Sequence, residues 1–186
     1  MPTSKKRKKK EFLFDFDTKQ VLHLHRQIFL YGAINDSVAN SIKQQMIAFD
    51  IVSKQPITLW LSSPGGSCSA GLSLIEIVRK IESPVITIIN SEVCSMASMI
   101  SVCGDLRWAF KDTGVWMQHP MSALVADDLE KIKDRTAFLV TYNEILTKIL
   151  KDKTKLTSSD YKKIEVGELW LTGNQLLEKG VVDKLL

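Results

Sequence analysis

The run Pro84–Asn90 (PVITIIN) constrains the fold more than any other segment. It is apolar and β-branched almost throughout, as in a strand that is buried on both faces of a parallel sheet. Parallel strands need long crossover connections, which are usually helices. Apolar residues recur at helical spacing before it, from Val38 to Phe49, and again over residues 69–82. The sequence therefore predicts an α/β domain with a largely parallel sheet.

The rest of the chain continues this alternation without an internal repeat or an interdomain linker. Further strands are predicted over residues 27–31, 56–62, 106–110, 114–118 and 168–171. Further helices are predicted over residues 95–103 and 127–152, and after capping boxes at Thr157/Asp160 and Thr172/Gln175, with Gly180 closing the last one. Residues 27–186 are thus expected to form a single domain.

The positive net charge comes from the N-terminus. Of the +4 total, six positive charges lie in residues 5–10, and the remainder has 19 basic and 21 acidic residues, a net charge of −2. We expect residues 1–10 to be a disordered basic arm, either a solubilising tail or a segment that binds an acidic partner, nucleic acid or a membrane surface. The body itself does not favour nucleic-acid binding.

Other features indicate a cytoplasmic protein that does not span a membrane. No apolar run reaches the roughly 18 residues that cross a bilayer, and no apolar signal core follows the basic arm. The three cysteines, Cys68, Cys94 and Cys103, form no CxxC pair, so we expect buried free thiols in a reducing compartment, without a disulfide or a zinc site. Neither a metal nor a cofactor is expected.

Two turns could carry chemistry. Gly65 and Gly66 lie in a Ser-Pro-Gly-Gly-Ser turn between a predicted strand and a helix, where main-chain N–H groups can bind an oxyanion or a phosphate. Ser95 lies at the start of an apolar helix, where the helix dipole favours developing negative charge. Taken singly, the first turn could be an ordinary connection and Ser95 a simple N-cap.

The histidines favour a catalytic interpretation. His23 and His25 precede the core and are expected at the surface, whereas His119 directly follows the predicted strand 114–118. A lone histidine at a strand end is more often structural than catalytic. A glycine turn, a helix-initiating serine and a strand-end histidine together are, however, what acyl transfer requires.

With these residues in place, the chain resembles the proteolytic subunits of the Clp protease, the ClpP family, as a divergent member. The resemblance covers residues 27–186 and rests on several motifs in matching order. These are Ser63–Gly66 for the Ser-Pro-Gly-Gly turn, Cys94-Ser95-Met96 for the nucleophile segment, Met117–Pro120 for the histidine segment, and Trp170–Thr172 with Gly180–Asp183 near the C-terminus.

The resemblance implies the roles of the site residues. Ser95 would be the nucleophile and His119 the general base, and the N–H groups of Gly66 and Met96 would form the oxyanion hole. Glu168 occupies the position of the family's aspartate, so it would orient the histidine with a side chain that is one methylene longer. The residues expected to bind the substrate backbone are Gly65, Met121, Ser122 and Ala123, although the family's glycines are missing from the last three positions.

The resemblance also implies the fold and the partners. We expect the ClpP/crotonase-like superhelical fold of repeated β-β-α units, with residues 11–26 lining an axial pore. The subunit would assemble into stacked rings, with or without a paralogous subunit. It would cleave unfolded polypeptides that an AAA+ unfoldase delivers, and Trp60 lies at a position of the family's docking cleft for that unfoldase.

Three alternatives remain open. The loss of the glycines and the glutamate at position 168 would also fit a catalytically weak ring subunit that supports an active paralogue. A crotonase-type acyl-CoA enzyme would share the fold and the oxyanion hole, but it would need an acid/base carboxylate and a groove for coenzyme A, which the sequence does not suggest. A phage-type capsid-maturation peptidase would use the same serine chemistry on another substrate.

Overall fold

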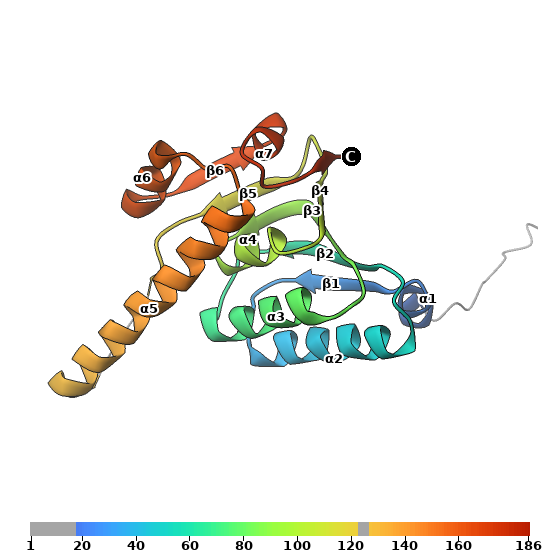
Figure 1. Cartoon of the computed structure of the whole chain (residues 1–186), viewed down its shortest axis with the longest axis horizontal. Helices are drawn as coiled ribbons and strands as arrows, with labels where there is room; N and C mark the ends of the chain where they lie inside the picture. The colour runs from blue at the N-terminus through green and yellow to red at the C-terminus, as the bar shows by residue number, and fades with distance from the viewer. Residues whose placement is uncertain (1–17, 123–126) are drawn as a thin grey trace, which may run out of the picture.

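The computed structural model describes residues 18–122 and 127–186, which form a seven-stranded mixed sheet and seven helices (Figure 1). The strands are β1 (Gln27–Tyr31), β2 (Ile57–Ser63), β3 (Val85–Cys94), β4 (Leu106–Ala109), β5 (Val115–Gln118), β6 (Leu169–Thr172) and β7 (Lys184–Leu185). The helices are α1 (Thr18–Leu24), α2 (Asp36–Val52), α3 (Cys68–Lys80), α4 (Met96–Ser101), α5 (Leu129–Lys153), α6 (Ser158–Val166) and α7 (Asn174–Glu178).

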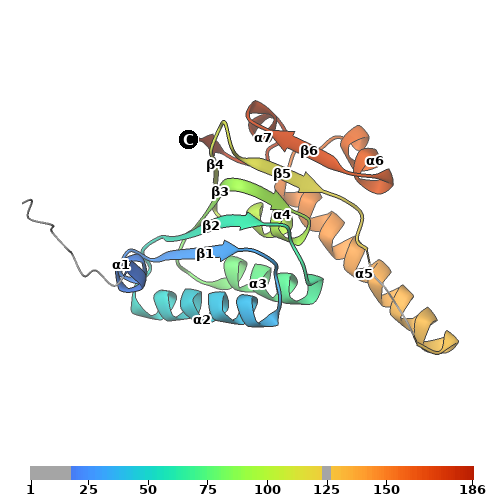
Figure 2. The same cartoon turned by 180° about the vertical axis from the view of Figure 1, so that it is seen from behind.

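The predicted α/β architecture is confirmed. β1, β2, β3, β4 and β7 pair in parallel in that order, and most of the β3 residues predicted to be buried are fully or partly buried. Figure 2 shows β1, β2, β3 and β5 in front, with α3, α4 and α5 behind them, so these helices cover one face of the sheet. The alternating burial along β2 follows from this arrangement, because every second side chain points into the helix layer.

β3 changes its partner halfway along, and this change positions the site. Its first half, Ile86–Ile89, pairs with β4, whereas its last residues, Glu92–Cys94, pair with β5. β5 in turn pairs with β6 in antiparallel orientation. The end of β3 therefore lies beside the end of β5, and the start of β6 lies on the other side of β5.

The boundaries differ from the prediction in informative places. β3 continues to Cys94, four residues past its predicted end. Its last residues pair with β5, and these backbone hydrogen bonds extend the strand through a segment whose exposed Glu92 gave no strand pattern in the sequence. The capping box of Thr157 and Asp160 is present as expected. The predicted capping box of Thr172 and Gln175 is wrong. The N-cap of α7 is Gly173, at φ 50°, and of the two expected hydrogen bonds only the one from the backbone N–H of Thr172 to the Gln175 side chain is present.

Single residues mostly lie where they were expected. His23 and His25 are exposed, and the described structure contains no disulfide, since all three cysteines are free. Cys68 is the exception, because it is half-buried at the start of α3 instead of buried. α1 and the short β7 had no clear sequence signal and were not predicted. Residues 1–17, which include the predicted basic arm, lie outside the described residues.

α5 extends from the body of the protein in both views (Figures 1 and 2). Its N-terminal half carries three exposed apolar side chains, Leu129, Phe138 and Val140, and Ile145 in its C-terminal half is also exposed. Among the helices of the described residues, none combines the length and the apolar character needed to cross a membrane.

Candidate active site

Ser95 lies in a strained turn between β3 and α4. Its backbone adopts φ 54° and ψ −124°, a region that a residue with a side chain occupies at a cost of about 1–3 kcal/mol. Its N–H donates to the carbonyl of Met117 at 2.9 Å, which fixes the turn to β5. Such a turn presents the side chain of its central residue away from the strand, so the hydroxyl can reach the surface of the domain.

The glycine turn after β2 packs directly against this strained residue. A Cβ on Gly65 would lie 2.7 Å from the carbonyl oxygen of Cys94 and 2.8 Å from the Cβ of Ser95. The N–H of Gly65 donates to Ser63 Oγ at 3.1 Å, and its carbonyl accepts from the N–H of Ile34 at 2.8 Å. Only a glycine can approach Ser95 this closely, so the close packing explains the glycine at position 65.

Two backbone donors face the same cavity as Ser95. The N–H groups of Gly66 and Met96 have no acceptor within the described part of the chain. Gly66 is held at φ 148° by a bridge to Ile34, and Met96 is the first residue of α4. A pair of preorganised N–H groups of this kind can stabilise an oxyanion, and that role for these two residues stays a prediction.

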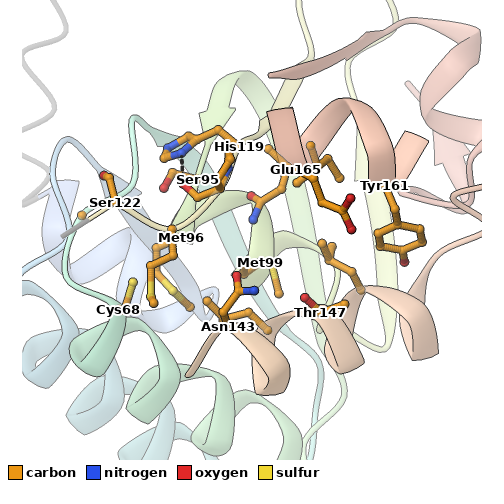
Figure 3. Close-up of a pocket in the computed structure, with 17 residues that line it drawn as sticks. Cys68, Ser95, Met96, Met99, His119, Ser122, Asn143, Thr147, Tyr161 and Glu165 are labelled. Carbon is orange, nitrogen blue, oxygen red and sulfur yellow. Dashed lines mark hydrogen bonds between the residues drawn. The ribbon is translucent and has the colours of Figure 1, made fainter. Parts of the chain in front are cut away.

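His119 follows β5 and lines the cavity together with Ser95 (Figure 3). The preceding Gln118 is buried and accepts a hydrogen bond from Ser98 at 2.6 Å, which fixes the end of β5. The Nδ1 atom of His119 lies 2.5 Å from the carbonyl oxygen of Pro120. Because a carbonyl oxygen only accepts, Nδ1 is the donor in this contact, and Nε2 is the ring nitrogen that could act as a base.

Glu168 lies at the expected end of the sheet but has another partner. Gln118 pairs with Leu169 in the β5–β6 ladder, so Glu168 lies opposite His119. Its carboxylate is exposed and accepts a hydrogen bond from the indole N–H of Trp170 at 2.8 Å. In the described residues no hydrogen bond joins Glu168 to His119. Glu168 therefore lies beside His119 but does not orient the imidazole in this structure.

A cavity of about 240 Å³ extends from Ser95 and His119 toward α5 and α6. Of the residues expected to bind substrate, Met121 and Ser122 line it, whereas Gly65 is buried beneath Ser95 and does not. Ala123 lies outside the described residues. The sequence analysis missed the lining residues that α5 and α6 supply, although their spacing of three and four residues marks one face of each helix. These are Asn143, Leu146, Thr147 and Leu150 from α5, and Tyr161, Ile164 and Glu165 from α6.

The cysteines near the site are poor nucleophiles. Burial, together with a hydrogen bond to Glu92, raises the pKa of the Cys94 thiol to about 12. Burial also raises the pKa of Cys68, which lines the cavity. Thiols react as thiolates, and both groups stay protonated at neutral pH. Within the described ranges, no three His, Cys, Asp or Glu side chains gather to hold a metal ion.

Comparison with known proteins identifies similar sequences over nearly the whole chain. A family model described as Clp protease matches residues 9–186. The chain is 29% identical over 185 residues to the ATP-dependent Clp protease proteolytic subunit of Streptococcus uberis, covering 92% of this chain and 89% of that protein. It is 27% identical over 171 residues to ATP-dependent Clp protease proteolytic subunit 3 of a Synechococcus strain, covering 89% and 84%.

Proposed function

The chain belongs to the Clp protease family as a Clp-type peptidase subunit, and from this premise we propose that it is an ATP-dependent serine endopeptidase that acts through Ser95 and His119. The observation that carries the proposal is the register of β3 and β5. It brings a strained serine and a histidine to one cavity, beside two backbone donors that have no acceptor among the described residues.

The reaction would proceed in two halves. His119 Nε2 takes the proton of Ser95 Oγ as this oxygen attacks the scissile carbonyl, and the resulting oxyanion accepts hydrogen bonds from Gly66 and Met96. The imidazolium then protonates the leaving amine, the C–N bond breaks, and an ester to Ser95 remains. Water attacks this ester with His119 again as the base, which releases the acid and restores the serine.

A fluorophosphonate probe tests the nucleophile directly. We expect one covalent adduct per subunit on the peptide that contains Ser95 when the assembled protein is labelled and analysed by mass spectrometry, because only a serine with a base and an oxyanion hole reacts quickly. Ser91→Ala, which removes an exposed serine hydroxyl outside this cavity, should label at a similar rate.

The labelling result also separates the alternatives. No adduct in the assembled protein would favour a catalytically weak subunit that supports an active paralogue. An adduct on a different residue would contradict the proposed mechanism. An acyl-CoA enzyme would require a carboxylate as acid or base in place of the serine and histidine, so its activity would survive the loss of the Ser95 hydroxyl.

We assign the orienting role to Glu168. In the active state its carboxylate would release the indole N–H of Trp170 and accept a hydrogen bond from His119 instead. A move of the carboxylate to Nδ1 would replace the Pro120 carbonyl with a charged acceptor, and hydrogen bonds to charged groups are the stronger ones. The longer glutamate side chain suits a partner across the β5–β6 ladder.

Substitutions of Glu168 and of its present hydrogen-bond partner Trp170 test this role. Glu168→Gln should lower kcat/KM by at least about tenfold, because an uncharged amide stabilises the imidazolium less. Trp170→Phe removes the competing N–H donor and should keep or raise kcat/KM. Glu92→Gln, which neutralises another exposed carboxylate near Cys94, should change it less than twofold. Full activity of Glu168→Gln in peptidase assays would require reassignment of the third role alone.

The exposed apolar side chains of α5 support assembly. Phe138 and Tyr142 pack against each other at 4.6 Å between ring centroids, on a helix that extends from the body. Burying Phe138, which is 57% exposed, against other copies would remove apolar surface from water. Membership of the family implies oligomers, and we propose that they are stacked rings, with or without a paralogous subunit.

The uncovered face of the sheet supports a docking role. Phe29, Tyr31, Trp60 and Phe110 form a continuous aromatic strip there, with neighbouring ring centroids 5.4 to 6.5 Å apart. Three of the four are at least 37% exposed. Exposed aromatic patches of this kind mark protein–protein contacts. We propose that an AAA+ unfoldase binds here and feeds unfolded polypeptides to the cavity.

The N-terminal segments complete the proposal. We assign residues 11–26 to an axial pore and residues 1–10 to a basic arm outside the peptidase domain at residues 27–186. Three free cysteines suit a reducing compartment, and we place the protein in the cytoplasm on that basis.

A further inference from the structure

The cavity combines apolar side chains with a carboxylate. Besides Ser95 and His119, its lining includes the side chain of Glu165 from α6 (Figure 3). The apolar part of the lining comes from Met96, Met99, Leu146, Leu150 and Ile164. A substrate side chain in this cavity can therefore contact both hydrocarbon and a carboxylate.

Glu165 has no internal partner that would neutralise it. Within the described residues, no Lys or Arg forms an ion pair with its carboxylate. Lys148 and Lys151 line an adjoining outer cavity with Glu165, but Lys151 lies over the ring of Tyr161, at 5.7 Å from its centroid. Among the described residues that line this cavity, Glu165 is the one Asp, Glu, Lys or Arg.

We propose that Glu165 sets the specificity of this cavity, which selects a lysine or arginine as the residue that supplies the scissile carbonyl. Both side chains have an aliphatic stem that packs on an apolar wall and a cationic head that seeks a polar partner. Donation from that head to a carboxylate is a charge-assisted hydrogen bond. The inference rests on the proposed function, since it takes Ser95 as the residue that attacks the bond.

The same charge would reject acidic side chains. A glutamate in the cavity would place two carboxylates near each other, which is unfavourable, and part of the discrimination would come from this repulsion. A neutral unbranched side chain such as norleucine would fill the apolar part of the cavity. It has no group that could donate to Glu165, so the carboxylate would be hydrogen-bonded by water alone. The expected order of preference is lysine or arginine, then norleucine, then glutamate.

Binding to the Ser95→Ala protein tests the specificity without relying on the chemistry. The probes are two fluorescent peptides that are identical except for a C-terminal lysine or norleucine, and fluorescence anisotropy with the assembled protein gives their Kd values. We expect the lysine peptide to bind about fivefold more tightly, as befits a partly exposed ion pair. This preference should weaken as the salt concentration rises.

Substitutions at matched positions identify the responsible carboxylate. Glu165→Gln should abolish the preference for lysine and leave the Kd of the norleucine peptide within twofold. Glu144→Gln makes the same charge change on α5, in the outer cavity but not in this one, and should preserve the preference. Equal binding of both peptides before substitution, or a preference that survives Glu165→Gln, would overturn the proposal.

Hydrolysis by the unsubstituted protein separates this inference from the proposed function. Cleavage after lysine that exceeds cleavage after norleucine, and that Glu165→Gln equalises, would support both. Hydrolysis that depends on Ser95 without any such ratio would overturn the specificity alone. A Glu165-dependent binding preference in a protein that never cleaves would support the specificity and contradict the peptidase mechanism.

Discussion

Ser95→Ala should lower kcat/KM for peptide hydrolysis by at least about a thousandfold, because removal of the nucleophile from a serine–histidine site leaves only binding and the oxyanion hole. The neighbouring thiols should not replace it, since burial keeps Cys68 and Cys94 protonated at neutral pH. A fluorogenic peptide assay on the assembled protein, at matched subunit concentration, measures the effect.

Stability measurements provide the control for this variant. Alanine at φ 54° is as strained as serine, so the free energy of unfolding should change by less than about 0.5 kcal/mol. Ser95→Gly should be equally inactive but should relieve the strain and become more stable by about 1 kcal/mol. Full activity of a folded, assembled Ser95→Ala protein would refute the proposed nucleophile.

Gly65→Ala should be the most damaging substitution outside the reacting groups, with a loss of at least about a hundredfold in kcat/KM. The new methyl group would lie under 3 Å from the Cys94 carbonyl oxygen, Ser95 Cβ and the N–H of Met96, so the turn must move. A displacement of about 1 Å at a reacting group is enough to cost this factor. The rate of fluorophosphonate labelling should fall with it.

Gly32→Ala is the matched control. Gly32 also has a positive φ, 77° against 92° for Gly65, but a Cβ there would meet nothing within 4 Å. Backbone strain alone should cost about 1 kcal/mol of stability and leave the labelling rate unchanged. If Gly65→Ala labelled as fast as Gly32→Ala, close packing against Ser95 would not be what positions the nucleophile.

Much of the fold could be predicted because local signals agreed with the tertiary structure. The apolar run at the start of β3 and the helical spacing in α2 and α3 are consequences of burial, which leaves a periodic pattern in the sequence. Ser95 and His119 could be proposed as site residues because their motifs occur in order at strand ends. The pairing of β3 with β5 then accounts for their proximity.

The remaining features depend on contacts between distant segments, which periodicity does not record. The switch of β3 from β4 to β5 has no local signature. Thr172 looked like an N-cap because Gln175 follows at the right spacing, but Gly173 adopts the strained conformation that starts α7. Glu165 looked like any surface glutamate, because its place in the cavity is known only once α5 and α6 pack beside Ser95.

α5 connects two distant regions of the molecule mechanically. Its C-terminal half supplies walls of the cavity, whereas its N-terminal half carries most of its exposed apolar residues. Its 25 residues span about 37 Å, so a tilt of about 5° about one end displaces the other by about 3 Å. A neighbouring subunit that binds the protruding end of α5 would thus change the shape of the cavity. The cleavage preference would then depend on the assembled oligomer and not on the single subunit.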